Sequence, residues 1–156
     1  MNSGGPWDGM DLDGPPDRSR VVEDGLEVLR ESECLALAAR RPIGRVAVWV
    51  GAFPTVAPVN FCFVGPDVVF RTAAGTKFAA AVRGATVAFE VDDFDAIGHR
   101  GWSVVIVGEA SEVGASVLAD LEPLPVRSWV RGVRNHVIRI RSEFVSGRRI
   151  VRSPEA

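Results

Sequence analysis

Residues 45–72 read RVAVWVGAFPTVAPVNFCFVGPDVVFRT, three apolar segments of β type with two short turns between them. The segments are expected at 45–50, 55–64 and 68–72, and the turns, rich in glycine and proline, at 51–54 and 65–67. Connections this short join antiparallel neighbours, because a parallel pair needs a crossover of about a dozen residues or more. The stretch therefore predicts an antiparallel sheet.

The flanking sequence adds three more strands and three short helices. Strands are predicted at 87–91, 101–113 and 136–144, with Gly108 as a bulge or bend in the long one. A helix is predicted from its N-cap Ser32 to the break at Pro42 and Gly44, and further helices at 76–83 and 114–121. The stretches 92–100 and 122–125 are expected to be loops.

Six strands at hairpin spacing, interrupted by short helices, predict a mainly β fold built as a six-stranded antiparallel barrel. Closing the sheet into a barrel also protects strand edges that would otherwise be exposed. Residues 1–20 lack hydrophobic periodicity and are expected to form a disordered N-terminal tail. Residues 21–152 are then expected to form a single domain.

The composition excludes several classes of protein. A hydrophobic fraction of 47% rules out wholesale disorder, and the apolar runs are too short for a membrane span of about 20 residues. The N-terminus lacks the order of a secretory signal, so the cytoplasm is the expected location. A net charge of −2, without aromatic residues among the basic ones, argues against nucleic-acid binding. The cysteines and histidines lack metal-ligand spacing, so Cys34 and Cys62 are expected to be reduced packing residues and no metal site is expected.

The segment 70–77, FRTAAGTK, contains the one lysine among the 18 basic residues of the chain. It follows a predicted strand and opens a predicted helix, where backbone N–H groups lack internal partners. The candidates to hold a phosphate there are Arg71, Thr72, Thr76 and Lys77, with charge-assisted bonds of roughly 1.5–3 kcal/mol each. The spacing leaves an ordinary surface turn open as the alternative. The glycine patterns of Walker and Rossmann nucleotide sites are absent.

Two other short groups of residues are candidate ligand contacts. Asn60, within the segment 59–61, either pairs a planar heterocycle or braces the backbone, because a buried amide needs partners. Trp102 and Ser103, at the start of the long strand, either contact a planar ligand or serve in packing. No nucleophile–base pair is recognisable, so an enzyme with this sequence would rely on a cofactor.

Six short motifs occur in a fixed order along the chain. They are 43–47 (IGRVA), 58–61 (PVNF), 69–72 (VFRT) with 75–77 (GTK), 87–92 (VAFEVD), 101–104 (GWSV) and 146–149 (SGRR). No single motif is decisive, but their order and spacing between residues 27 and 151 are specific. In these respects the chain resembles the pyridoxamine 5′-phosphate oxidase-like, FMN-binding split-barrel family, and in particular its small branch.

The resemblance implies a homodimer of six-stranded antiparallel split β-barrels with FMN bound at the subunit interface. In such a dimer the flavin phosphate is held by Arg71, Thr72, Thr76 and Lys77. The residues along the isoalloxazine ring are Val59, Asn60 and Phe61. The ring is approached from the long strand by Trp102 and Ser103.

The function implied by the resemblance is that of an FMN-dependent oxidoreductase acting on a small-molecule substrate. Two alternatives are a deazaflavin-dependent reductase and a protein that binds flavin or haem without catalysis. Haem ranks last, because neither histidine has the sequence context typical of a haem ligand. The chain contains no tyrosine, which the family's pyridoxamine phosphate site includes, so pyridoxamine phosphate is not the expected substrate.

Overall fold

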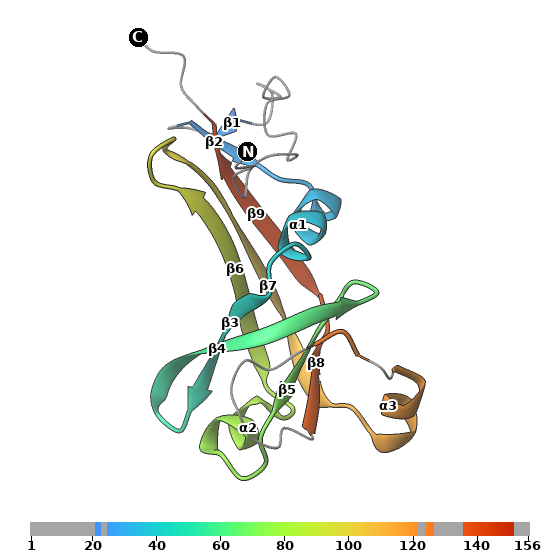
Figure 1. Cartoon of the computed structure of the whole chain (residues 1–156). Helices are drawn as coiled ribbons and strands as arrows, with labels where there is room; N and C mark the ends of the chain where they lie inside the picture. Colours follow the sequence, from blue (N-terminus) through green and yellow to red (C-terminus); the bar gives the residue numbers. More distant parts are fainter. Residues whose placement is uncertain (1–20, 23–24, 122–123, 127–135, 152–156) are drawn as a thin grey trace, which may run out of the picture.

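The computed structural model describes residues 21–22, 25–121, 124–126 and 136–151 (Figure 1). The three strands predicted within residues 45–72 are present as β3 (Ile43–Val50), β4 (Phe53–Val64) and β5 (Asp67–Thr72), each antiparallel to the next. The β3–β4 turn is shorter than predicted and begins at Gly51, which has a φ of 60°. Two-residue hairpin turns need a positive φ, which glycine adopts without steric cost. The predicted tail, 1–20, and residue 152 lie outside the described residues.

Three further strands close this sheet into a barrel. β6 (Thr86–Asp95) and β7 (Arg100–Glu112) form a long hairpin, and β8 (His136–Ile140) pairs with both β5 and the end of β7. The order around the ring is β3-β4-β5-β8-β7-β6, and every pairing in it is antiparallel. The predicted six-stranded antiparallel barrel is therefore confirmed.

Strands β9 (Phe144–Ile150), β2 (Leu26–Val28) and β1 (Val21–Val22) extend the sheet beyond the ring. β9 pairs with residues 101–107 of β7 and β8 with residues 110–112, so one edge of β7 serves two partners in turn. Gly108 lies at this junction, where a Cβ atom would be 1.6 Å from the Arg141 carbonyl oxygen. The bulge or bend predicted at Gly108 thus corresponds to the point where β7 changes its pairing partner. The backbone at Arg141 comes so close there that only glycine fits without a shift.

Two further predicted boundaries are wrong, and strands β1, β2 and β9 were not predicted. The strand expected at 136–144 ends at Ile140, because the chain turns so that the Glu143 amide donates to the Val107 carbonyl at 3.2 Å. Much of the loop expected at 92–100 is strand, since β6 and β7 remain paired as far as Asp95 and Arg100. Pairing with a neighbouring strand overrides the polar sequence there.

All three predicted helices are present, but α1 ends at Ala38, before the predicted break at Pro42 and Gly44, and it has a different cap. α1 (Glu31–Ala38) has Arg30 at its N-cap, and the Arg30 amide donates to the Glu33 carboxylate at 2.8 Å. Ser32 is therefore inside the first turn and is not the cap. α2 (Lys77–Val82) follows its cap Thr76, and α3 spans Ala115–Leu121. None of the helices in the described ranges has the length and apolar character needed to cross a membrane.

Side chains alternate between the inside and the outside of the barrel wall. The inside is apolar, with fully buried members that include Val46, Phe70, Phe89, Ile106 and Ile138. A second apolar cluster on the outside packs against α3. Cys34 and Cys62 are free thiols, as predicted; Cys34 is fully buried and Cys62 half-buried, and burial raises the pKa of both.

Candidate functional site

The basic segment joins the end of β5 to the start of α2. Thr76 caps the helix, because its Oγ1 accepts a hydrogen bond from the Ala79 amide at 2.9 Å. Arg71 is half-buried and Thr72 is buried, whereas Thr76 and Lys77 are exposed. The segment therefore carries a hydroxyl and a cation on an exposed loop directly after a buried strand.

Lys77 has no counter-charge within the described ranges. Its ammonium forms no hydrogen bond or ion pair with a described residue. In contrast, Arg83 Nε lies 2.8 Å from Glu112, and Arg139 Nε lies 2.7 Å from Asp67. Lys77 is therefore open to an external anion, to which an ammonium donates charge-assisted hydrogen bonds.

The residues predicted on β4 lie next to those predicted on β5. Phe61 pairs with Phe70 across the two strands, and the same register puts Asn60 opposite Arg71. Asn60 also braces the backbone, since its Nδ2 donates to the Pro42 carbonyl at 3.3 Å. The Phe61 amide donates to the same carbonyl at 3.3 Å. The bracing role that the sequence left open is present, and it ties β4 to the chain entering β3.

Strand alternation divides the predicted residues between two faces of the sheet. Those on the outer face are Asn60, Arg71 and Ser103, and those on the inner face are Val59, Phe61, Thr72 and Trp102. Trp102 is 4% exposed within the main core, and its Nε1 has no hydrogen-bond partner among the described residues. One ligand cannot touch side chains on both faces of a strand. The outer set is therefore the candidate for ligand contact, and the inner set shapes the wall beneath it.

The outer residues of β4 and β7 stand in one row across the sheet. Asn60 pairs with Ile43 of β3, and Asp92 of β6 pairs with Ser103 of β7. β3 and β6 pair at Arg45 and Glu90. The same register, continued by two residues, places Ile43 beside Asp92 on the same face. At about 4.8 Å per strand, Asn60 and Ser103 are about 15 Å apart. The structure thus makes Asn60 and Arg71 neighbours and puts Ser103 farther along the same face.

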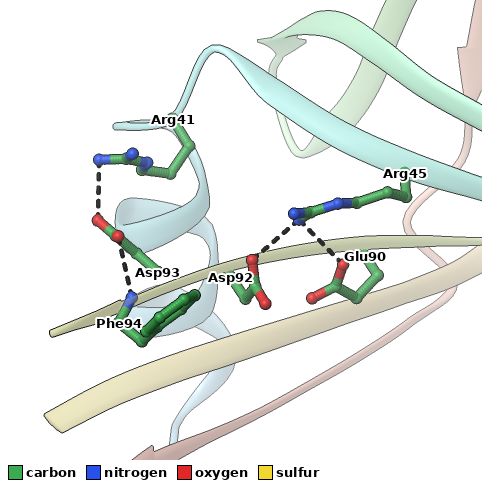
Figure 2. A network of polar contacts seen from close by, with 6 residues as sticks. All are labelled: Arg41, Arg45, Glu90, Asp92, Asp93 and Phe94. Carbon is green, nitrogen blue, oxygen red and sulfur yellow. Dashed lines mark hydrogen bonds and ion pairs between the residues drawn. The ribbon is translucent and has the colours of Figure 1, made fainter. Parts of the chain in front are cut away.

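A charged network of Arg45, Glu90 and Asp92 lies on the outer face of this part of the sheet, and Arg41 forms a separate ion pair with Asp93, the strand partner of Trp102 (Figure 2). Arg45 Nη1 lies 2.9 Å from Asp92 and 3.3 Å from Glu90, and Arg41 Nη1 lies 2.8 Å from Asp93. Burial and the Asp92 carboxylate raise the pKa of Glu90, and Arg45 partly offsets this. Sequence reasoning missed the network, although acids at alternate positions along β6 are a sign that they share one face.

An apolar row lies next to this network on the outer face. It crosses the sheet strand by strand through Val56 on β4, Ala47 on β3, Ala88 on β6, Val107 on β7 and Phe144 on β9. Val56 is 66% and Phe144 71% exposed. Contiguous apolar surface of this kind marks contact sites.

Sequence reasoning also missed a cluster of three polar residues at the end of the barrel near α2. Arg83, Glu112 and His136 are in contact, although His136 is 24 residues from Glu112 and 53 from Arg83. No local pattern joins residues so far apart. Over the described ranges, no three His, Cys, Asp or Glu side chains are grouped so that they could hold a metal ion.

Comparison with known proteins gives consistent matches. The chain matches the profile of the family "Pyridoxamine 5′-phosphate oxidase" over residues 30–149. It is 35% identical over 142 residues to the uncharacterized protein Rv0080 of Mycobacterium tuberculosis, covering 88% of this chain and 90% of that one.

Two solved structures share the fold at comparable identity. The FAD binding protein from Mycobacterium smegmatis is 31% identical with a TM-score of 0.68, covering 79% of this chain and 97% of that one. The conserved protein of unknown function DIP1874 from Corynebacterium diphtheriae is 31% identical with a TM-score of 0.68, covering 82% and 100% of the two chains. With the barrel and the ordered motifs, these matches show that the chain belongs to the pyridoxamine 5′-phosphate oxidase family.

Proposed function

We propose that this protein binds FMN on the outer face of its barrel and acts as a flavin-dependent oxidoreductase. The observation that carries the proposal is Lys77, an exposed ammonium without a counter-charge in the described ranges, on the loop that follows Arg71. Family membership supports a flavin, as does the 31% identity to an FAD binding protein. FMN and FAD share the isoalloxazine ring and the phosphate on the ribityl chain, so one site can serve either.

The flavin phosphate is assigned to the loop between β5 and α2. Lys77 and Arg71 supply two positive charges. Thr76 keeps its hydroxyl proton for donation while its oxygen caps α2. Thr72 is buried beneath, with its Oγ1 3.5 Å from the Ala73 carbonyl, and it steadies the start of the loop.

The isoalloxazine ring is assigned to the outer face of β4. The β4–β5 register, continued by one residue beyond the Phe61–Phe70 pair, brings Asn60 next to Arg71, so a ligand anchored at the loop meets Asn60 next. Val59 and Phe61 turn their side chains inward, and any contact they make with the ring is through their backbone. Ser103 is on the same outer face about 15 Å away, whereas Trp102 supports β7 from the inside.

We propose that the apolar row binds a second copy of the chain. The row spans the sheet from Val56 to Phe144, and Trp49, 66% exposed on the β3–β4 hairpin, enlarges the same face. A two-fold axis brings the same patch of two copies together, which suits a self-complementary apolar surface. Such a homodimer places the flavin site beside the subunit interface.

A bound flavin supplies hydride or electron transfer between a donor and a small-molecule acceptor. The residues of this chain bind the phosphate at Lys77 and Arg71 and orient the ring along β4. The apolar row and the second copy keep water away from one side of the site. Exclusion of water strengthens the charge-assisted bonds that hold the ligand.

The test is a titration of the purified chain with FMN, and in parallel with FAD and a deazaflavin coenzyme, followed by fluorescence. Lys77→Ala should bind FMN about 10- to 150-fold more weakly, which corresponds to the loss of about 1.5–3 kcal/mol. Arg40→Ala, which removes an exposed cation after α1, serves as the matched control and should bind like the wild type. Equal affinities of Lys77→Ala and wild type would refute the phosphate site. Reduction of bound flavin by a nicotinamide donor, with turnover of an acceptor, then tests the oxidoreductase assignment.

A further inference from the structure

Arg45 uses only one of its three side-chain nitrogens in the charged network on the outer face. Its Nη1 lies 2.9 Å from Asp92 Oδ1 and 3.3 Å from Glu90 Oε2 (Figure 2). Nε and Nη2 form no hydrogen bond or ion pair with a described residue, and the Arg45 side chain is 41% exposed. Arg45 therefore keeps unused donors on an accessible surface.

The unused donors of Arg45 have a defined geometry. The N–H bond of Nε and one N–H bond of Nη2 are parallel and lie in the plane of the guanidinium, so together they match two adjacent acceptors in one plane. The two carboxylates hold Nη1 on the other side of the group, which limits the rotation of that plane. Arg45 thus offers a pair of donors that is already ordered before a ligand arrives.

Arg45 lies beside the part of β4 to which the isoalloxazine ring is assigned. It pairs with Pro58, and Ile43, two residues before it on the same face, pairs with Asn60. Asn60 is therefore a diagonal neighbour of Arg45 across the two strands, at about 7–8 Å, which a long side chain can span. A ring that starts at Asn60 extends either toward Pro58 or toward Ile43. Arg45 is adjacent to both, so it borders the ring in either orientation.

The charges of the network indicate which kind of acceptor Arg45 suits. One guanidinium contacts two carboxylates, so with both ionised the network carries a net charge of −1. The surplus negative charge repels an anion such as a phosphate, whereas it leaves an uncharged acceptor unaffected. Lys77, by contrast, has no counter-charge within the described ranges and suits the phosphate. The outer face therefore separates a site for an anion from a site for an uncharged acceptor.

We propose that Arg45 is a further flavin-binding residue, which donates two hydrogen bonds from Nε and Nη2 to one edge of the isoalloxazine ring. The edge that fits carries two adjacent acceptors, N1 and the carbonyl oxygen on C2, and both are uncharged in the oxidised flavin. The inference rests on the proposed function, because its premise is a flavin ring beside Asn60. It makes Arg45 a specificity-determining residue for the ring, separate from the phosphate site at Lys77.

The experiment measures the dissociation constants of FMN and two analogues that keep its phosphate, with the full chain. In 1-deaza-FMN a C–H group replaces N1, so one acceptor of the proposed pair is lost. In 5-deaza-FMN the same replacement is made at N5, away from that pair. Arg45→Met removes the donors, and Arg45→Lys keeps a positive charge beside the carboxylates but lacks the parallel N–H bonds. Arg40→Met, at an exposed arginine after α1, is the matched control.

The wild type and Arg40→Met should bind 1-deaza-FMN at least about tenfold more weakly than FMN, which is the effect of losing a hydrogen bond from a charged donor. Both Arg45 variants should bind these two ligands within about twofold of each other. The ratio between 5-deaza-FMN and FMN should be the same in all four proteins. A general loss of structure would weaken all three ligands alike, so the ratios isolate the contact. Arg45→Lys decides the matter if Arg45→Met does not fold.

Equal discrimination between FMN and 1-deaza-FMN by the wild type and the Arg45 variants would overturn the inference and leave the proposed function standing. A change of the same size in the 5-deaza-FMN ratio would overturn it as well, because the effect would then not belong to the N1 edge. Absence of FMN binding by the wild type would instead overturn the proposed function.

Discussion

Replacing Gly108 with alanine should disrupt the junction at which β7 passes from β9 to β8. A Cβ atom there would lie 1.6 Å from the Arg141 carbonyl oxygen, whereas ordinary contact begins at 3.4 Å, so the turn after β8 must move by about 1.8 Å. Two hydrogen bonds hold this turn: the Arg141 amide donates to the Glu109 carbonyl at 3.0 Å, and the Glu143 amide to the Val107 carbonyl at 3.2 Å. Their loss costs about 2 kcal/mol, and the strain of overpacking adds about 1–3 kcal/mol.

We therefore expect Gly108→Ala to lower the free energy of unfolding by about 3–5 kcal/mol and the Tm by about 10 °C. Urea denaturation followed by tryptophan fluorescence measures the first, and calorimetry the second. Gly114→Ala is the control, because a Cβ at Gly114 meets no atom within 4 Å. Gly114 accepts the first hydrogen bond of α3, so its replacement should cost no more than about 1 kcal/mol. If Gly108→Ala is as stable as Gly114→Ala, the described closure of the barrel is wrong.

Three further predictions concern the cap of α2, the charged network and the apolar row. Thr76→Ala should lower the free energy of unfolding by about 1 kcal/mol in urea, while Thr76→Ser should not; equal stability of both would contradict the cap. The pKa of Glu90 is raised above its ordinary 4.5, so its ionised form is less favourable in the folded chain than in the unfolded one. The wild type should therefore lose stability relative to Glu90→Gln as the pH rises above about 4.5, and parallel thermal-unfolding profiles from about pH 4.5 to 7 would count against this. Val56→Ser combined with Phe144→Ser should convert a dimer to a monomer in analytical ultracentrifugation, and a monomeric wild type would contradict the proposed assembly.

The barrel strands could be predicted because each carries its own local pattern. Glycines with positive φ, such as Gly51 at 60° and Gly65 at 59°, mark the turns between apolar runs, and those runs are the strands. The end of β8 could not be predicted in this way. It is set by hydrogen bonds from Arg141 and Glu143 to β7, which lies more than 30 residues away in the sequence.

The candidate site was predictable in part. The sequence predicts the loop from Arg71 to Lys77, because a strand pattern, a flexible glycine and a helix cap follow one another there. Alternation also requires that Trp102 and Ser103 face opposite sides, but which side is outside depends on how the sheet closes. Likewise His136 meets Glu112 only because β8 pairs with the end of β7. A local sequence pattern carries no information on the contacts that strand pairing makes between distant segments.

We propose that the outer face of this barrel holds a flavin at Arg71 and Lys77. The most direct measurement is the absorption spectrum of the purified full chain, together with the mass of any cofactor released on denaturation. We expect a flavin spectrum and the mass of FMN, and the mass of FAD would keep the site while changing the ligand. A colourless protein that also leaves the fluorescence of added FMN and FAD unchanged would contradict the claim.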